Sequence, residues 1–357
     1  MNLKNRMILE DYRKSRDAFV KLGDIVHDML SSMAAESGVQ VMAIEHRVKS
    51  EESLAGKLAR SVDYYQAFED ITDILGARVI CFFEDEVDVI GKLVEKAFVI
   101  DWENSSDKRA LIKADTFGYL SLHYICSLPL GAGYPDEVCE KRFEIQIRTN
   151  LQHTWSAINH DLGYKSKFGV PREVTREFAR LSGLLEIADD EFVRVRDSMR
   201  AYTEETRKKI AENRAENVTI DRISLREYIS RNKKMREFLE KLAAFSGAEI
   251  SWIDPEGYIE QLMWLHKKTL GDLQNMLEEN GPLALALAER ALRNSELDIL
   301  ASSVGLRYLC RAELLNKGYT KEQAAEFLQI SVGNAQRAER QAKYLYDSWH
   351  RLKDSAE

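Results

Sequence analysis

Cysteine is scarce in this sequence, and its few positions form no pattern that would hold a metal ion or a disulfide framework. The chain has four cysteines in 357 residues: Cys81, Cys126, Cys139 and Cys310. They lie far apart, with no CxxC pair and no histidine at a spacing typical of zinc ligands. We therefore expect reduced, mostly buried thiols and no zinc site.

Long apolar runs are also missing. No segment approaches the roughly 20 apolar residues that a membrane-spanning helix needs. The first residues, MNLKNRMILEDYRKSRDAFVKL, are amphipathic and charged and lack the unbroken apolar core of a signal peptide. These two absences predict a cytoplasmic protein without a membrane partner.

An excess of positive charge is the third absence. The net charge is −8 and the charged fraction is 31%, so the chain as a whole is not built to wrap nucleic acid. A local basic face for small anions stays open. With 45% hydrophobic residues, a chain of 357 residues is long enough for two domains, each with its own core.

The apolar pattern of the first half predicts helices and then a mixed domain. In residues 1–38, apolar side chains recur at helical spacing, which predicts one or two helices that pack on the next domain. Residues 39–168 alternate between strand-like and helical runs, as is typical of an α+β domain around a mixed β-sheet. The polar stretch between Phe98 and Phe117 has no clear period, and we expect a loop beside a site there.

The second half is predicted to be helical. Residues 169–217 are expected to form a long helix and linker, with an apolar seam at heptad-like spacing from Val174 to Tyr202. This seam would pair with a second subunit, giving a homo-oligomer, or fold back on the first domain as intramolecular regulation. Residues 218–357 are expected to form an all-α domain with breaks at 246–258, 279–283, 316–319 and 331–334.

The last of these breaks faintly resembles the turn of a helix-turn-helix. In that arrangement Arg337 and Arg340 would face a groove of DNA. Helix pairs joined by a glycine turn are common packing units, however, and the chain is acidic. We therefore favour an interaction or autoregulatory domain over a DNA-binding one.

Two predicted strands carry polar side chains on one face each. Period-two alternation in RFEIQIRT and in GYLSLHY separates these polar residues from apolar ones on the opposite face. They are Glu144, Gln146 and Arg148 on the first strand, and Tyr119, Ser121 and His123 on the second. If the strands pair across PLGAGYPDE, the two polar faces form one surface. The alternative is an ordinary edge strand that shows its charges to water.

The next segment, LQHTWSAINHDLGY, predicts a helix with histidines on its polar side. At 100° per residue, His153, His160 and Tyr164 lie about 180° from an apolar stripe that includes Trp155. The histidines are therefore not simply core residues. A solvated polar face is the alternative interpretation.

Cations cluster further upstream. Arg47 and Lys49 lie on one side of a strand end, and Ser53 and Lys57 lie one turn apart on the following helix. Such a cluster suits a polyphosphate, although lysines on a helix surface are common without any ligand.

Asp73 is placed at a junction before a strand, in DILGARVI, where Gly76 is expected to permit a tight turn and Arg78 to enter the strand. The aspartate is either a capping residue or a ligand of Mg²⁺, since Mg²⁺ prefers one or two carboxylates together with phosphate oxygens.

These segments together resemble the synthetase domain of RelA/SpoT-type alarmone synthetases over about residues 40–168. The resemblance implies a nucleotidyltransferase-like fold flanked by helices. It implies ATP binding by Arg47, Lys49, Ser53, Lys57 and Arg78. It also implies Asp73 and Glu144 as the catalytic and magnesium-binding acids, and acceptor binding by Tyr119, Ser121, His123, Gln146, Arg148 and His153.

The implied reaction is attack of an acceptor's 3′-oxygen on the β-phosphorus of ATP, with release of AMP. The acceptor is GDP or GTP by default in this family, whereas related toxic synthetases use adenine nucleotides or the 3′ end of tRNA. Asp115, Leu120 and Asn159 depart from the family pattern around the acceptor. A domain that binds nucleotide without catalysis is the third alternative. Only about forty residues precede the synthetase segment, too few for the hydrolase domain of the long relatives.

Overall fold

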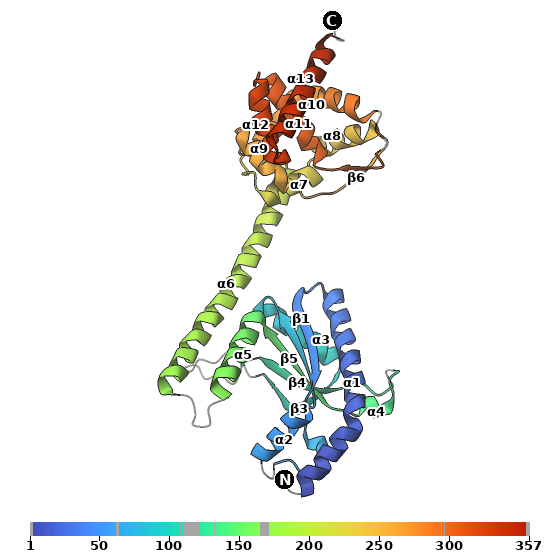
Figure 1. Ribbon diagram of the computed structural model, residues 1–357, viewed down its shortest axis with the longest axis vertical. Coiled ribbons are helices and arrows are strands. Elements are labelled where there is room, and N and C mark those ends of the chain that lie inside the picture. The colour runs from blue at the N-terminus through green and yellow to red at the C-terminus, as the bar shows by residue number, and fades with distance from the viewer. Residues whose placement is uncertain are drawn as a thin grey trace. The chain divides into compact units, whose positions relative to one another are not determined.

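The computed structural model describes residues 3–61, 64–107, 109, 121–131, 133–164, 171–293, 295 and 297–354. The chain divides into two compact units, Met1–Arg196 and Asp197–Glu357, which Figure 1 shows as a sheet with helices and a group of helices. Each unit has its own apolar core.

The N-terminal unit is built on a five-stranded mixed sheet. Its strands are β1 (Val41–Val48), β2 (Leu75–Cys81), β3 (Val99–Asp107), β4 (Leu122–Ser127) and β5 (Phe143–Thr149), in the order β1-β2-β5-β4-β3. Only β2 and β5 run parallel, and the other neighbours are antiparallel. The predicted pairing of the two polar strands is therefore confirmed as β4 against β5, with the short helix α4 (Asp136–Cys139) between them.

Helices cover one face of this sheet. The first predicted helical region forms a single helix, α1 (Leu3–Ser37), which packs on β1 and β2, while α3 (Glu84–Ala97) packs on β2, β3 and β5. Side chains such as Ile145 and Ile147 are fully buried beneath them. The shorter helix α2 (Glu51–Arg60) and the 3₁₀ turn η1 (Phe68–Asp70) lie between β1 and β2 in the chain. The buried apolar face leaves the opposite face of each strand for polar residues.

Two local predictions for this unit are wrong. The polar stretch after Phe98 does not begin with a loop, because Val99–Asp107 pairs with β4 as an edge strand. Because an edge strand is partly exposed to water, it can be polar without a clear alternation of apolar residues. The polar sequence of Val99–Asp107 therefore resembled that of a loop. Gly76 does not form a turn either; it lies inside β2, opposite Arg47 and Glu144. The remainder of the predicted loop lies outside the described residues.

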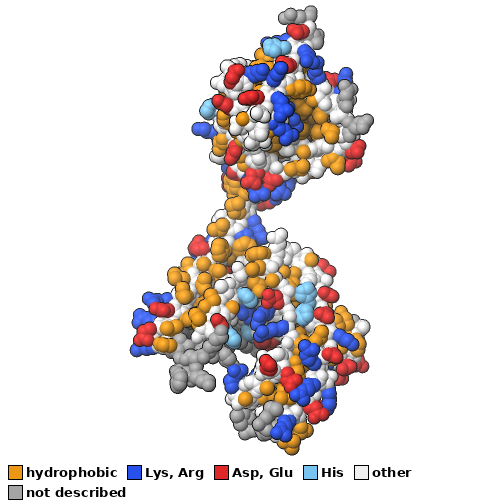
Figure 2. Space-filling view, viewed as in Figure 1, with side chains coloured by type: hydrophobic (Ala, Val, Ile, Leu, Met, Phe, Trp, Pro, Cys, Tyr) orange, Lys and Arg blue, Asp and Glu red, His pale blue; other side chains and the backbone are white. Residues whose placement is uncertain are grey.

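Two helices come after the sheet: α5 (Asn150–Tyr164) and α6 (Arg172–Ala211). The long helix was predicted, but part of its apolar seam is exposed: Leu181, Phe192 and Val195 are each about half exposed or more, and Figure 2 shows apolar side chains gathered over this region. The buried side of α6 is polar instead, since Asp189 accepts a hydrogen bond of 2.6 Å from Thr149. Phe178, near the start of the seam, packs edge-on against Trp155 of α5, so that part of the seam does contact the first domain.

The C-terminal unit is a group of packed helices. They are α7 (Arg222–Arg231), α8 (Lys233–Ala244), α9 (Ile259–Trp264), α10 (Leu270–Leu292), α11 (Val304–Asn316), α12 (Lys321–Val332) and α13 (Ala335–Asp354), with a 3₁₀ turn η2 (Glu256–Tyr258). One short parallel pair, β6 (Glu249–Ser251) with β7 (Ile299–Ala301), joins them. The mixed sheet with a helical half after it confirms the predicted fold class.

One predicted break in this unit is wrong. The segment ENGPL does not end a helix, because α10 continues through Pro282. The preceding Asn280 is buried and hydrogen-bonded to Glu313 and Asn316 of α11, and this packing outweighs the cost of proline in a helix. The turns at Gly318 and Gly333 are as expected, with φ values of 72° and 66° that favour glycine.

A search of the described helices for a membrane span finds none that combines sufficient length with sufficient apolar character.

Candidate functional site

The polar face of the sheet gathers the strand residues singled out in the sequence. Strand register aligns Arg78 of β2 with Gln146 of β5, and Gln146 with His123 of β4. One step along, Glu144 lies opposite Gly76 and Ile125. Figure 2 shows cationic, acidic and histidine side chains gathered together on this unit. Residues from three different strands therefore form one continuous polar surface.

Glu144 is held by two neighbours. Its Oε1 lies 2.7 Å from Nδ1 of His123, and its Oε2 accepts a hydrogen bond of 2.8 Å from Gln146. The other ring nitrogen of His123, Nε2, lies 2.7 Å from the hydroxyl of Ser121. An ionised carboxylate only accepts hydrogen bonds, so Nδ1 of His123 is the donor to Glu144. The carboxylate is thereby fixed in orientation.

Gln146 connects this acid to two arginines. Its side-chain oxygen accepts a hydrogen bond of 3.3 Å from Nε of Arg78 and another from Arg148. Burial, and then the nearby charge of Arg78, lowers the pKa of Arg148 to about 10. Burial, and then the charge of Arg47, lowers the pKa of Arg78 as well. Both guanidiniums stay charged at neutral pH, and their mutual repulsion favours an added anion.

Asp73 binds two lysines at the end of the sheet where Glu144 lies. Its Oδ2 lies 2.5 Å from Nζ of Lys49 and its Oδ1 lies 2.8 Å from Nζ of Lys57. Burial opposes the charge of Asp73, but the hydrogen bonds from the lysines outweigh it, so the pKa of this carboxyl lies below its ordinary value. Asp73 precedes β2 by two residues, and Glu144 is the second residue of parallel β5, which pairs with Gly76. The two acids therefore lie near the same strand ends.

The remaining upstream residues surround this pair. Arg47 lies at the end of β1, opposite Gly76. Ser53 is exposed in the first turn of α2, where its backbone amide donates to the capping hydroxyl of Ser50 at 3.2 Å. Lys57 lies one turn later on the same helix. Ser53 and Lys57 therefore lie one turn apart on α2, and Lys57 is the one of the two that contacts Asp73.

His153 lies in the first turns of α5, half-buried. Its Nδ1 is buried without a hydrogen-bond partner. Burial, and then the charge of Arg148, lowers the pKa of this imidazole, so the ring is neutral at pH 7. His160 is exposed, as are Ile158 and Leu162 of the predicted apolar stripe, so α5 buries less of that stripe than its period suggested. Tyr119, Asp115 and Leu120 lie outside the described residues, as does the side chain of Tyr164.

Three residues that support the site were not singled out from the sequence. The hydroxyl of Tyr12 on α1 donates to the backbone oxygen of Lys49 at 2.6 Å. The ring of Tyr65 lies 5.1 Å from Nζ of Lys57. Ser50 caps α2. The Ser50 cap carried a sequence signal, a serine before two acids and a helical run. Tyr12 gave no distinct sequence signal, because it also fits the apolar stripe of α1. Tyr65 gave no signal either.

The donor set fits a magnesium ion shared with a substrate and not one caged by protein. Among the residues that the structure describes, no group of three or more histidine, cysteine, aspartate or glutamate side chains could hold a metal. Mg²⁺ commonly takes one or two carboxylates and completes its shell with phosphate oxygens and water. Asp73 and Glu144 supply that number of carboxylates.

Comparisons with known proteins identify the family of the segment that contains these strands. A model of the family described as "Region found in RelA / SpoT proteins" matches residues 46–168. GTP pyrophosphokinase YwaC of Bacillus subtilis (strain 168) is 31% identical over 160 residues, 43% of this chain and 74% of that protein. GTP pyrophosphokinase YjbM of the same strain is 29% identical over 153 residues, 42% of this chain and 69% of that protein.

Solved structures are also similar to the chain. The small alarmone synthetase 1 from Bacillus subtilis is 23% identical, and its alignment covers 54% of this chain and 99% of that one with a TM-score of 0.45. A GTP pyrophosphokinase family protein from Streptococcus pneumoniae is 24% identical, with a TM-score of 0.46 over 57% of this chain and 97% of that one. Because the match to YwaC spans 74% of that protein at 31% identity, and the family match spans the strands of the site, the chain belongs to the RelA/SpoT family.

Proposed function

We propose that the N-terminal unit transfers the β,γ-pyrophosphate of ATP to the 3′-hydroxyl of GDP or GTP, making (p)ppGpp and releasing AMP. The observation that carries this proposal is the pair of acids near the same strand ends. Asp73 is held by two lysines, and Glu144 is held between His123 and Gln146. The names of the curated relatives, both GTP pyrophosphokinases, support the same activity.

In this proposal the upstream cations bind ATP. Lys49 and Lys57 exchange part of their contact with Asp73 for phosphate oxygens, and Arg47 and Ser53 extend the same edge. Arg78 projects from β2 beside them and holds the adenine. Cations placed where charge develops on the transferred phosphates stabilise the transition state and cost little reorganisation.

Glu144 is the proposed general base or orienting group for the 3′-hydroxyl. The hydroxyl oxygen forms a bond to the β-phosphorus, the bond from that phosphorus to the α-phosphate oxygen breaks, and AMP leaves with the electron pair. The proton of the hydroxyl passes to the carboxylate. His123 keeps one oxygen of Glu144 fixed, which favours a single attacking geometry.

Asp73 and Glu144 would hold Mg²⁺. The ion would supply charge neutralisation on the phosphates. On the acceptor side, Tyr119 is the proposed stacking residue, and Ser121, Gln146, Arg148 and His153 the polar contacts.

We place the protein in the cytoplasm, where ATP and guanine nucleotides are available and the four buried thiols stay reduced. The C-terminal unit is proposed as a regulatory or interaction domain. The exposed seam of α6 is proposed as a contact with a second copy of the chain, and sedimentation of the purified protein tests this by its mass.

A label-transfer assay tests the proposed function. Purified protein is incubated with Mg²⁺ and ATP labelled in the β-phosphate, and separately with GDP, GTP, AMP, ADP and deacylated tRNA. We expect label on GDP and GTP with an equal amount of AMP. Label on adenine nucleotides or tRNA alone would replace the guanine acceptor with that of the toxic synthetases. AMP without any labelled acceptor would contradict the transferase proposal.

A further inference from the structure

A cavity in the C-terminal unit is lined by arginines and by no acidic side chain among the described residues. It has a volume of about 300 Å³ and lies where η2, α9, α11, α12 and α13 meet. Its charged lining residues are Arg307, Arg311 and Arg337, and Gln341 and Ser331 are among its polar ones. We call it the arginine cavity.

Arg311 is the least satisfied of these residues. Its Nε is buried without a hydrogen-bond partner, and its Nη2 reaches only the side-chain oxygen of Gln341, at 3.3 Å. Burial, and then the charge of Arg307, lowers the pKa of Arg311 to about 10. The guanidinium therefore keeps its charge at neutral pH. A cation in a buried setting is normally paired with an anion, because its lost hydration is otherwise uncompensated.

Two helices hold the cations together against their repulsion. Arg307 and Arg311 are four residues apart on α11, and Arg337 and Gln341 are four residues apart on α13, so each pair shares a helix face. Like charges at this spacing destabilise a helix slightly. None of the three arginines meets a carboxylate within the described part of the chain. Arg307 and Arg337 are exposed to solvent, so an anion in the cavity would chiefly compensate the recessed charge of Arg311, with the other two arginines at its mouth.

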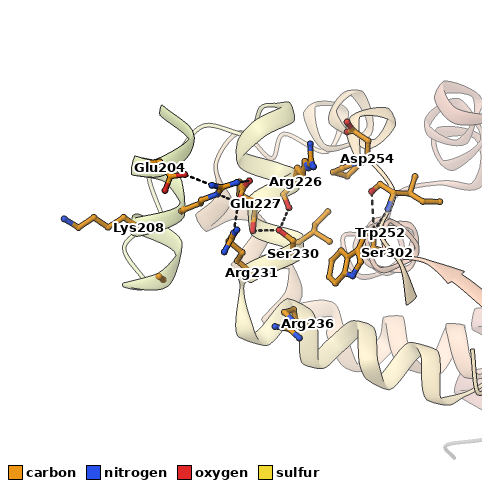
Figure 3. Close-up of a pocket in the computed structure, with 15 residues that line it drawn as sticks. Glu204, Lys208, Arg226, Glu227, Ser230, Arg231, Arg236, Trp252, Asp254 and Ser302 are labelled. Atoms are coloured by element: carbon orange, nitrogen blue, oxygen red, sulfur yellow. Dashed lines mark hydrogen bonds and ion pairs between the residues drawn. The ribbon is translucent and has the colours of Figure 1, made fainter. Parts of the chain in front are cut away.

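A larger cavity in the same unit shows the ordinary arrangement. It has a volume of about 1250 Å³, and its lining includes Arg207, Glu227 and Arg231. Glu227 accepts hydrogen bonds from Arg207 at 2.8 and 3.0 Å and from Arg231 at 2.7 Å. Figure 3 shows Arg231 beside Glu227. Glu227 thus pairs with two of the arginines that line the larger cavity. The arginine cavity has no acidic side chain among its described lining residues, so none of its arginines has such a partner there.

We propose that the arginine cavity binds the terminal phosphate group of a small phosphorylated ligand. Guanidinium groups match phosphate oxygens with paired N–H donors, and three of them suit a dianion. The volume is at the small end of ligand sites, enough for a phosphate and a little of what it is attached to. Arg311 is recessed on α11, so a chain-end phosphate reaches it more readily than a phosphodiester inside a duplex. The site would let the C-terminal unit sense a phosphorylated metabolite.

Calorimetric titration of the full chain with inorganic phosphate, pyrophosphate and AMP tests this. The N-terminal site also attracts phosphates, so the informative quantity is the difference between variants. Arg311→Met keeps the length of the side chain and removes its charge. We expect it to weaken the phosphate binding that belongs to this cavity at least tenfold, and the double variant Arg307→Gln with Arg337→Gln to do the same. Arg340→Gln, an exposed arginine of α13 outside the cavity, serves as the matched control and should bind as the natural chain does.

Thermal unfolding without phosphate separates binding from folding. Because it removes an uncompensated charge, Arg311→Met should unfold at the same temperature as the natural chain or higher, and phosphate should raise that temperature less than in the natural chain. Equal phosphate binding by the natural chain and Arg311→Met would overturn the proposal. So would binding of a duplex with 5′-hydroxyl ends, which carries only phosphodiesters, in the absence of binding to phosphate, pyrophosphate and AMP.

Discussion

Cations meet carboxylates on the N-terminal sheet face, whereas the arginine cavity of the C-terminal unit offers them none among the described residues. Asp73 takes both Lys49 and Lys57. Arg311 has only the amide oxygen of Gln341 at 3.3 Å. In the first site Lys49 and Lys57 must give up contacts with Asp73 when they bind a polyphosphate. In the arginine cavity Arg311 would gain an anion without losing a carboxylate partner. The same residue types thus favour a turnover site in one unit and a sensing site in the other.

Removing the acid that holds the two lysines should have the largest effect among the variants that alter charge pairing. Asp73→Asn keeps the shape of the side chain but releases both lysines and removes the proposed metal ligand. We expect pyrophosphate transfer to fall on the order of 10²–10³-fold, because metal and cation placement contribute several kcal/mol to the transition state. Metal-free ATP should bind at least as tightly as before, since the lysines become free for phosphate, and titration without Mg²⁺ measures this.

Asp190→Asn is the control for that variant, because Asp190 is an exposed acid of the same unit on α6. Its transfer rate should match the natural chain. Unchanged transfer by Asp73→Asn would remove Asp73 from the site.

Adding an acid to the arginine cavity should have a smaller effect, and it should stabilise the protein. Gln341→Glu places a carboxylate beside Arg311 and makes the arginine cavity resemble the first site. We expect the free energy of unfolding of the C-terminal unit to rise by about 1–2 kcal/mol, as charged hydrogen bonds do, and phosphate binding to weaken. Urea denaturation measures the first change. In the background of Arg311→Met the gain should vanish; a gain that persists there would have another cause.

The site strands could be anticipated from the sequence because their alternation has a period of two. Glu144, Gln146 and Arg148 lie on the polar face that this period predicts, and Ile145 and Ile147 are fully buried opposite them. Charge pairing could not be anticipated, since the contact of Asp73 with Lys49 joins residues 24 positions apart through the pairing of β1 with β2.

Tertiary packing also overrode local signals elsewhere. Pro282 lies inside α10, and the polar residues after Phe98 form an edge strand. The α6 seam has the right period, but Leu181, Phe192 and Val195 on its apolar side are exposed while Asp189 is buried. The period of the apolar residues predicts that a helix or strand has an apolar face. It does not predict which part of the protein covers that face. The arginine cavity is formed by residues of η2, α9, α11, α12 and α13 and has no local motif.

Lowering the pH should reduce the stability that Asp73 contributes and leave the contribution of Arg311 unchanged. This is the smallest of the expected effects. The pKa of Asp73 is held below its ordinary value of 3.8 by the lysines, after burial has opposed its charge. Its contribution to stability is therefore complete above about pH 5 and is lost as the pH falls through the lowered folded value. Asp73→Asn should lack this loss, whereas Arg311→Met should retain it. Chemical denaturation of each variant between pH 6 and about pH 3 measures the slopes. Identical slopes in the natural chain and Asp73→Asn would contradict the lysine pairing.

The most direct test of the central claim is the substitution Glu144→Gln, with transfer and ATP binding measured on the same sample. We expect transfer of labelled pyrophosphate to GDP to fall on the order of 10²–10⁴-fold, as loss of a general base does, while the affinity for ATP stays within about a factor of three. Glu140→Gln, an exposed acid after α4, should change neither. Transfer by Glu144→Gln at the natural rate would contradict the proposed catalytic role of this face of the sheet.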